Sequence, residues 1–165
     1  MSTTTPQPIR NHPPSERLIR ALEAHAAAES HDVASYRELT SRSADPVLGL
    51  LVEMIVADDQ RHQALVQAML QGLGANPDSV APPSALATAS DAPAADTEVA
   101  ASVRALIRDE HESARHLRYL ARQEPGLYSG LFPLLLETMA RDGEKHALIL
   151  RFLLRRYEER ATGGA

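Results

Sequence analysis

The sequence contains no cysteine, which excludes disulfide bonds, thiolate zinc sites and cysteine-ligated iron–sulfur clusters. Any bound metal ion must therefore be held by oxygen and nitrogen ligands. Aromatic residues make up only 4% of the chain, and no apolar run reaches the length of a membrane span. The net charge is -5, and the arginines are scattered at helical spacings rather than gathered in a basic stripe. We therefore expect no nucleic acid and no membrane among its partners.

What the sequence does contain is long stretches of Ala, Leu, Arg and Glu, which favour helices. Its 165 residues, 44% of them hydrophobic, can bury a real core but leave no room for a second catalytic domain. Ser15 can cap a first helix, Asp45 before Pro46 is typical of a second helix start, and Pro125-Gly126 separates two later helices. These signals predict four amphipathic helices, at residues 15–41, 46–71, 97–124 and 129–160.

The segments outside these helices have a different composition. Residues 75–95 are rich in Ala, Pro, Ser and Asp without periodicity, which predicts a linker long enough to travel the length of a helical bundle. Residues 1–14 are rich in Thr and Pro, and we expect them and the tail at 161–165 to be disordered. Because the amino end has neither an apolar signal core nor a twin-arginine pattern, we expect a cytoplasmic protein.

A short polar motif occurs twice, once in the second predicted helix and once in the fourth. Residues 58–62 read DDQRH and residues 142–146 read DGEKH, so that each motif places an acid and an imidazole four residues apart. Apolar residues step by three and four on both sides of each motif, so the acid and the imidazole should both face the interior. An ionised carboxylate buried without a partner costs several kcal/mol. We infer that a bound metal supplies the compensation.

The two halves of the chain read as duplicates of one helical hairpin. Asp58 aligns with Asp142, and His62 aligns with His146, when the second hairpin loop is made slightly longer. Two antiparallel helical hairpins joined by a long crossover linker predict an all-α fold, a four-helix bundle. In such a bundle the equivalent residues of the two halves face each other near a pseudo-twofold axis.

The first and third predicted helices each offer one carboxylate toward this centre. Glu29 lies in the apolar ladder of the first helix, and the repeat register makes Glu110 its counterpart, although a second register would select Glu112. We favour Glu110 because the apolar stripe of its helix centres on it. One carboxylate from each of two helices, with an acid and an imidazole from each of the other two, is a set that iron, manganese or zinc uses in a bundle core.

With these motifs, the chain resembles the ferritin-like superfamily, in particular its small rubrerythrin-like, carboxylate-bridged di-iron branch. The resemblance rests on Glu29-Ser30 followed by Tyr36, and on the motifs at 58–62 and 142–146, where family members read Asp-Glu-x-Arg-His. It implies that the acids opening the two motifs, Asp58 and Asp142, orient the imidazoles. It implies that the metal ligands are Glu29, Asp59, His62, Glu110 and His146.

Two residues depart from the family pattern. Asp59 replaces a longer Glu, and Gly143 stands where the fourth helix should supply a carboxylate. Asp142 or Glu144 could take the place of the missing ligand, and Asp142 is the better substitute because it lies on the apolar seam. Alternatively, the Asp that opens each motif could chelate together with the His that closes it. Water could also fill the position, or the site could hold one metal or none. The implied cofactor is iron, as one or two ions, with manganese or zinc as alternatives.

Two functions from different classes follow. The first is a metal-dependent oxidoreductase, with ferroxidase-like or rubrerythrin-like peroxidase activity toward dioxygen or peroxide. Because the chain lacks the cysteine-bound iron module of full rubrerythrins, this enzyme would need an external electron donor. The second is a metal-free or zinc-stabilised helical scaffold with a degenerate site, acting as an interaction protein. A homodimer is compatible with either function.

Overall fold

The computed structural model describes residues 16–75 and 95–163. Within these ranges the chain forms four α-helices and one short 3-10 helix, and no strand. The predicted all-α, four-helix class is therefore confirmed. The elements are α1 (Glu16–Ser41), α2 (Pro46–Gly72), α3 (Asp96–Gln123), η2 (Leu127–Gly130) and α4 (Leu131–Gly163).

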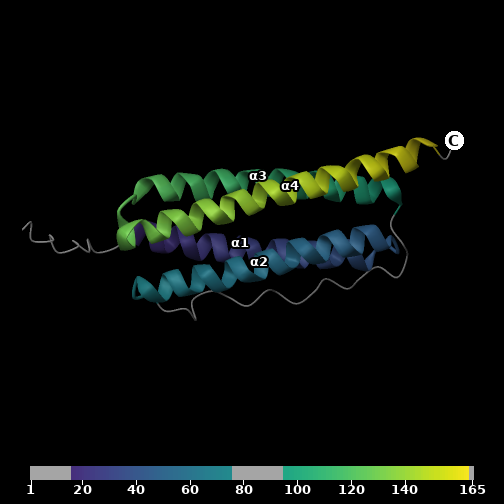
Figure 1. Cartoon of the computed structure of the whole chain (residues 1–165). Helices are drawn as coiled ribbons and strands as arrows, with labels where there is room; N and C mark the ends of the chain where they lie inside the picture. Colours follow the sequence, from purple (N-terminus) through teal and green to yellow (C-terminus); the bar gives the residue numbers. More distant parts are fainter. Residues whose placement is uncertain (1–15, 76–94, 164–165) are drawn as a thin grey trace, which may run out of the picture.

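The helices form two antiparallel hairpins that lie side by side, α1 with α2 and α3 with α4 (Figure 1). The end of α2 and the beginning of α3 lie at opposite ends of the bundle. Nearly all of the predicted linker at 75–95, and the whole predicted extension at 1–14, fall outside the described residues. Helix α4 continues to Gly163, so the first three residues of the predicted tail at 161–165 are helical.

The start of α2 ties the two hairpins together. Asp45 caps this helix, as predicted, because its Oδ1 accepts a hydrogen bond from the Val47 amide at 3.0 Å, and Pro46 occupies the first helical turn. The other carboxylate oxygen of Asp45 lies 3.1 Å from Arg156 Nε and 2.9 Å from Arg160 Nη1, both on α4. One acid thus completes the helix start and pairs with the far end of the other hairpin.

The turn between α3 and α4 closes the opposite end of the bundle. Tyr128 and Ser129 adopt positive φ angles of 49° and 56°, followed by Gly130 at 86°. The hydroxyl of Tyr128 donates to the carbonyl oxygen of Gly72 at the end of α2, and its ring stacks on Phe132 with 4.5 Å between centroids. These contacts join the α3–α4 turn to the first hairpin.

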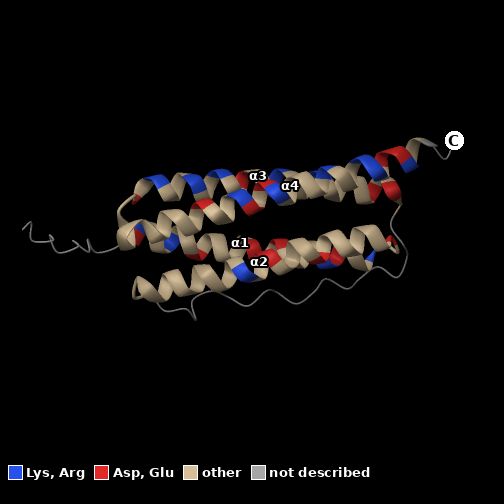
Figure 2. Ribbon diagram, in the orientation of Figure 1, with Lys and Arg blue, Asp and Glu red and all other residues tan. Residues whose placement is uncertain are grey.

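The core consists of two apolar clusters. One lies toward the α3–α4 turn and includes Leu22, Leu70 and Leu136, while the other lies toward the start of α2 and includes Ile55 and Leu153. Buried polar side chains occupy the layer between them: His25, Glu29, Asp58, Asp59, His62 and His146. In Figure 2, tan stretches of α2 flank a charged middle. No described helix combines the length and the apolarity that crossing a bilayer requires.

Candidate metal centre

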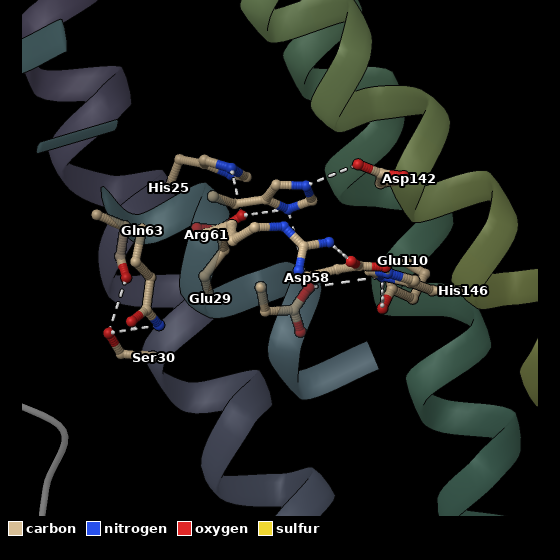
Figure 3. Close-up of polar contacts among 12 residues, drawn as sticks. His25, Glu29, Ser30, Asp58, Arg61, Gln63, Glu110, Asp142 and His146 are labelled. Atoms are coloured by element: carbon tan, nitrogen blue, oxygen red, sulfur yellow. Dashed lines mark hydrogen bonds and ion pairs between the residues drawn. The ribbon is translucent and has the colours of Figure 1, made fainter. Parts of the chain in front are cut away.

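All four helices contribute to the polar layer. Helix α1 carries Glu29, α2 carries the first motif, α3 carries Glu110 and α4 carries the second motif. The close-up in Figure 3 shows side chains of both hairpins directed toward one another at this level. Contacts within and between the hairpins connect the residues that the sequence singled out, namely Glu29, Asp58, Asp59, His62, Glu110, Asp142 and His146.

Three of these residues form a group that could hold a metal ion. The ligand atoms of Asp59, Glu110 and His146 all lie within 4.8 Å of one another. His146 Nδ1 is 3.2 Å from Glu110 Oε1 and 3.5 Å from Asp59 Oδ1. The His146 side chain is only 1% exposed. We call this group the Asp59–Glu110–His146 trio.

The first hairpin supplies an equivalent half of the centre. His62 Nδ1 lies 3.4 Å from Glu29 Oε1 and 3.9 Å from Asp59 Oδ1. The rings of His62 and His146 are stacked, with 6.2 Å between centroids. The contact between Glu29 and His62 therefore mirrors the contact between Glu110 and His146. Asp59 Oδ1 therefore lies near the Nδ1 atoms of both imidazoles.

The acids that open the two motifs contact the imidazoles of opposite hairpins. Asp142 Oδ2 is 3.1 Å from His62 Nε2, and Asp58 Oδ2 is 3.2 Å from His146 Nε2. Each motif therefore orients the histidine of the other motif. When Nε2–H donates to its carboxylate, Nδ1 keeps its lone pair and faces the centre, ready to bind a cation.

Two basic side chains neutralise these outer acids. Lys145 Nζ lies 2.6 Å from Asp58 Oδ2 and 2.6 Å from Asp142 Oδ1, and Arg61 pairs with Asp58. Burial alone would raise the pKa of Asp142, but hydrogen bonds from Lys145 and His62 outweigh burial and lower it. Neither cation was predicted to have a role, although both belong to the repeated motifs.

Among the described residues, no Lys or Arg side chain pairs with the inner carboxylates. Glu29, Asp32, Asp59 and Glu110 line a small cavity of about 10 Å³ together with Gly143, which is roughly room for a single water-sized occupant. Burial and the charge of Glu110 raise the pKa of Asp59 to about 7. The same two causes raise the pKa of Asp32 to about 6. Negative charge is therefore concentrated where a cation would fit.

Glu29 offers a free ligand atom to this cavity. Its Oε2 is buried and has no hydrogen-bond partner among the described residues. Its Oε1 lies 3.1 Å from His25 Nε2. Burial alone would raise the pKa of Glu29, but hydrogen bonds from His25 and His62 lower it. Glu29 therefore stays ionised with one oxygen uncommitted.

On α3 the structure distinguishes the two glutamates that the sequence left open. The side chain of Glu110 is 12% exposed and belongs to the trio, whereas that of Glu112 is 70% exposed and lies near Arg115. Tyr36 donates a hydrogen bond of 2.6 Å to Glu110 Oε1. Burial and the charge of Glu110 raise the pKa of Tyr36, which keeps the hydroxyl protonated. This contact was not predicted from the sequence.

Gly143 lies where α3 and α4 approach closely. A Cβ at this position would come within 3.3 Å of Glu110 Oε2 and 3.4 Å of Ala114 Cβ. A side chain at position 143 of α4 would therefore need space that borders on the carboxylate of Glu110 on α3. The absence of a side chain at Gly143 permits Glu110 to occupy its position.

The fold and the site together define the class of protein. It is an all-α bundle of four helices with a buried Asp, Glu and His group that could bind a metal ion. No family model and no curated protein sequence matches the chain. The chain is similar to the crystal structure of a protein from Xanthomonas campestris pv. campestris str. ATCC 33913, with a TM-score of 0.68 and 21% identity, covering 90% of this chain and 92% of that one. At this identity the likeness shows a shared fold alone.

Proposed function

We propose that the protein is a metal-dependent oxidoreductase that binds iron inside the bundle and reduces peroxide or dioxygen. The observation that carries this proposal is the Asp59–Glu110–His146 trio, whose ligand atoms lie within 4.8 Å of one another. Glu29 adds a buried carboxylate oxygen without a hydrogen-bond partner at the same cavity. Because a buried polar atom without a partner is costly, a bound cation gives this arrangement a physical reason.

The donor atoms favour a hard or borderline metal. Carboxylate oxygens suit manganese and other hard ions, imidazole suits iron and zinc, and a set that mixes both suits iron, manganese or zinc. The resemblance of the motifs at 58–62 and 142–146 to rubrerythrin-like proteins favours iron. Bound Fe(II) would supply one electron per ion, so that two such electrons, with two protons, would reduce one hydrogen peroxide to two waters. An external donor would have to return the electrons, since the chain has no cysteine-bound iron module.

The surrounding side chains orient and shield the ligands. Asp142 and Asp58 fix the two imidazoles through Nε2, and such outer contacts hold a metal-binding histidine in its tautomer and orientation. Tyr36 fixes Glu110 by donating to its carboxylate. The two apolar clusters on either side of the polar layer limit the access of water, which strengthens electrostatic interactions in the cavity.

Anaerobic titration with Fe(II), followed by addition of hydrogen peroxide, tests the proposal. We expect saturable binding measured by calorimetry, and then a near-ultraviolet absorbance as Fe(III) forms. His146→Ala should remove most of the binding, and Asp142→Asn should weaken it by about 10- to 100-fold, as for an outer contact of a metal-binding histidine. Glu112→Gln, with its side chain 70% exposed, is the matched control and should bind like the wild type. A wild-type protein without saturable binding would contradict the proposal.

A second function, a metal-free or zinc-stabilised scaffold, is favoured by one specific observation. Both ring nitrogens of His146 already have carboxylate partners, Glu110 and Asp58, so the network could fix helix register without a metal. Metal analysis of protein purified without chelator separates the two functions. Near-stoichiometric iron or manganese supports the oxidoreductase, whereas a metal-free or zinc-only preparation that takes up no Fe(II) supports the scaffold.

A further inference from the structure

The side of α3 that faces away from the core carries a stripe of basic side chains. Six residues follow one another by steps of three and four and so share one face of the helix: Arg104, Arg108, His111, Arg115, Arg118 and Arg122. In Figure 2, blue positions recur along α3. These arginines are scattered in the sequence, but the helix gathers them on one side of the bundle.

A groove lies in the middle of this stripe, between α3 and α4. Its lining consists mainly of basic side chains of α3, with two glutamates: Arg108, His111, Glu112, Ala114, Arg115, Arg118 and Glu144. We call it the α3–α4 groove. Glu144 pairs with Arg118 at 2.6 Å, so it neutralises one of the three arginines. The groove is therefore a basic place on a chain whose net charge is -5.

The other cations at the groove are available to an outside partner. Arg108 donates to a backbone carbonyl of its own helix, and no acidic side chain pairs with it among the described residues. Arg115 is 74% exposed and lies 4.0 Å from Glu112, which is a weak contact at the surface. Arg151 of α4 adds a further positive charge, because its guanidinium donates to His111 Nε2 at 2.7 Å rather than to an acid.

The groove and the cavity of the metal centre lie on opposite sides of the same two helical segments. Glu110 and Gly143 line the cavity, whereas the residues that follow them, His111 and Glu144, line the groove. Ala114 also lines the groove, and its Cβ lies 3.4 Å from a Cβ built at Gly143. Small side chains and helix backbone therefore separate a partner in the groove from the centre. The rate of electron transfer falls steeply with distance, so a thin wall favours transfer here.

We propose that the α3–α4 groove is the docking surface for an acidic electron-donor protein. This inference rests on the proposed oxidoreductase function, which needs an external donor. In each transfer the donor loses one electron, and one Fe(III) in the centre becomes Fe(II). Electron-transfer partners form small and transient interfaces, and complementary charges raise their rate of association. Glutamates within the stripe and the net charge of -5 fit a protein partner better than the phosphates of nucleic acid.

Reduced flavodoxin, an acidic protein that donates one electron at a time, is the probe for this proposal. Iron-loaded protein is oxidised with hydrogen peroxide and then mixed anaerobically with the probe in stopped flow. We expect the second-order rate constant for Fe(III) reduction to fall as salt is added, because salt screens the charges. Arg108→Glu combined with Arg115→Glu should lower this rate constant by at least about tenfold at low ionic strength. On metal-free protein, an NMR titration with oxidised flavodoxin should shift the amide signals of residues 108–118.

Arg20→Glu combined with Arg37→Glu is the matched control. Both arginines are exposed on α1 and neither lines the groove, so this variant has the same change in net charge at another place. Its rate constant should stay within about twofold of the wild type. Hexaammineruthenium(II), a small cationic reductant, should reduce both double variants at least as fast as the wild type, which verifies that their centres are intact.

Three results would each overturn the docking surface and leave the proposed function standing. The first is an equal loss of rate in the two double variants, and the second is a wild-type rate that does not depend on salt. The third is tighter binding of a short DNA duplex than of flavodoxin to the metal-free protein. A wild type that takes up no iron overturns the proposed function, and electron delivery at the groove with it.

Discussion

At the scale of single residues, Gly143 determines how closely α3 can approach α4. The Glu110 carboxylate beside it is held by Tyr36 and contacted by His146, so it has little freedom to move away. A methyl group at 143 would meet Glu110 Oε2 at 3.3 Å, and overpacking of this kind costs about 1–3 kcal/mol. For the same reason we do not expect Gly143→Glu to restore a working ligand.

We predict that Gly143→Ala lowers the affinity for Mn(II) by roughly tenfold or more, because it displaces the Glu110 carboxylate. Gly49→Ala is the control, since nothing lies within 4 Å of a Cβ built at that helical position. It should keep wild-type affinity and gain up to about 1 kcal/mol of helix stability. Calorimetry and urea unfolding measure the two effects. Equal Mn(II) affinities in both variants would count against a close approach at Gly143.

The sequence predicted which residues face the centre better than it predicted their partners. Helical spacing placed Asp58 and His62 on one inward face, and the structure has both buried. Spacing within one helix says nothing about contacts between hairpins, so the sequence could not show that Asp58 would contact His146. Asp32, which lines the cavity, could have been predicted to face it, because Asp32 follows Glu29 by three residues on the same helix. It was missed because neither repeated motif includes it.

At the scale of elements, the start of α2 depends on one side chain. Asp45 caps the helix and contacts Arg156 and Arg160 of α4, and its own side chain is 4% exposed. We predict that Asp45→Ala lowers the free energy of unfolding by about 2 kcal/mol, the upper range for the loss of a helix cap. The melting temperature should fall by about 4–8 °C.

Asp45→Asn separates the two roles of this residue. Asparagine keeps an oxygen that can accept from the Val47 amide but has no charge for the arginines, so about half of the loss should remain. Thermal unfolding followed by circular dichroism provides the measurement. If Asp45→Ala melts at the wild-type temperature, the cap contributes nothing to the stability of α2.

The helix boundaries were predictable where side chains carry the signal. Asp45 and Pro46 gave the start of α2, and the break at Pro125-Gly126 gave the end of α3. The 3-10 turn η2 was not predicted, because Tyr128 and Ser129 adopt positive φ angles that these residue types disfavour. Packing of Tyr128 on Phe132 and its hydrogen bond to Gly72 hold that turn, and such tertiary contacts are not visible in local sequence.

At the scale of the whole molecule, the collected carboxylates couple stability to pH. The pKa of Asp59 is raised to about 7 by burial and by Glu110, and the same causes raise the pKa of Asp32 to about 6. The ordinary value for both is 3.8, so at intermediate pH the folded chain holds protons that the unfolded chain has lost. Their contribution to stability is fully present below the ordinary pKa and is lost as the pH rises through the raised values.

We predict that metal-free protein becomes less stable to urea between about pH 5 and pH 8. Saturating Mn(II) should remove most of this loss, because the cation takes the place of the protons. At an Mn(II) concentration of about 100 times Kd it should add about 2.7 kcal/mol. Asp59→Asn should flatten the pH profile of the metal-free protein. A wild-type profile that is already flat without metal would contradict this prediction.

The overall arrangement was accessible from the sequence because the chain repeats itself. The duplicated motif predicted two similar hairpins, and the helices do form two antiparallel pairs (Figure 1). What the repeat could not give is how closely the helices approach. That approach depends on tertiary contacts, at Gly143 and Glu110 within the second hairpin and at Asp45 and Arg156 between the hairpins. The carboxylate that is missing at Gly143 could be read from the sequence, but its structural consequence required the neighbouring helix.

Each imidazole of the centre contacts an aspartate of the other hairpin, and this determines how a mutation in one motif affects the other. His62 is oriented by Asp142 and His146 by Asp58, so neither hairpin can prepare its own imidazole in isolation. A substitution of the aspartate in one motif should first change the orientation of the histidine in the other motif. The centre therefore exists only while both halves are folded together, and local fraying of either hairpin dismantles both sides at once.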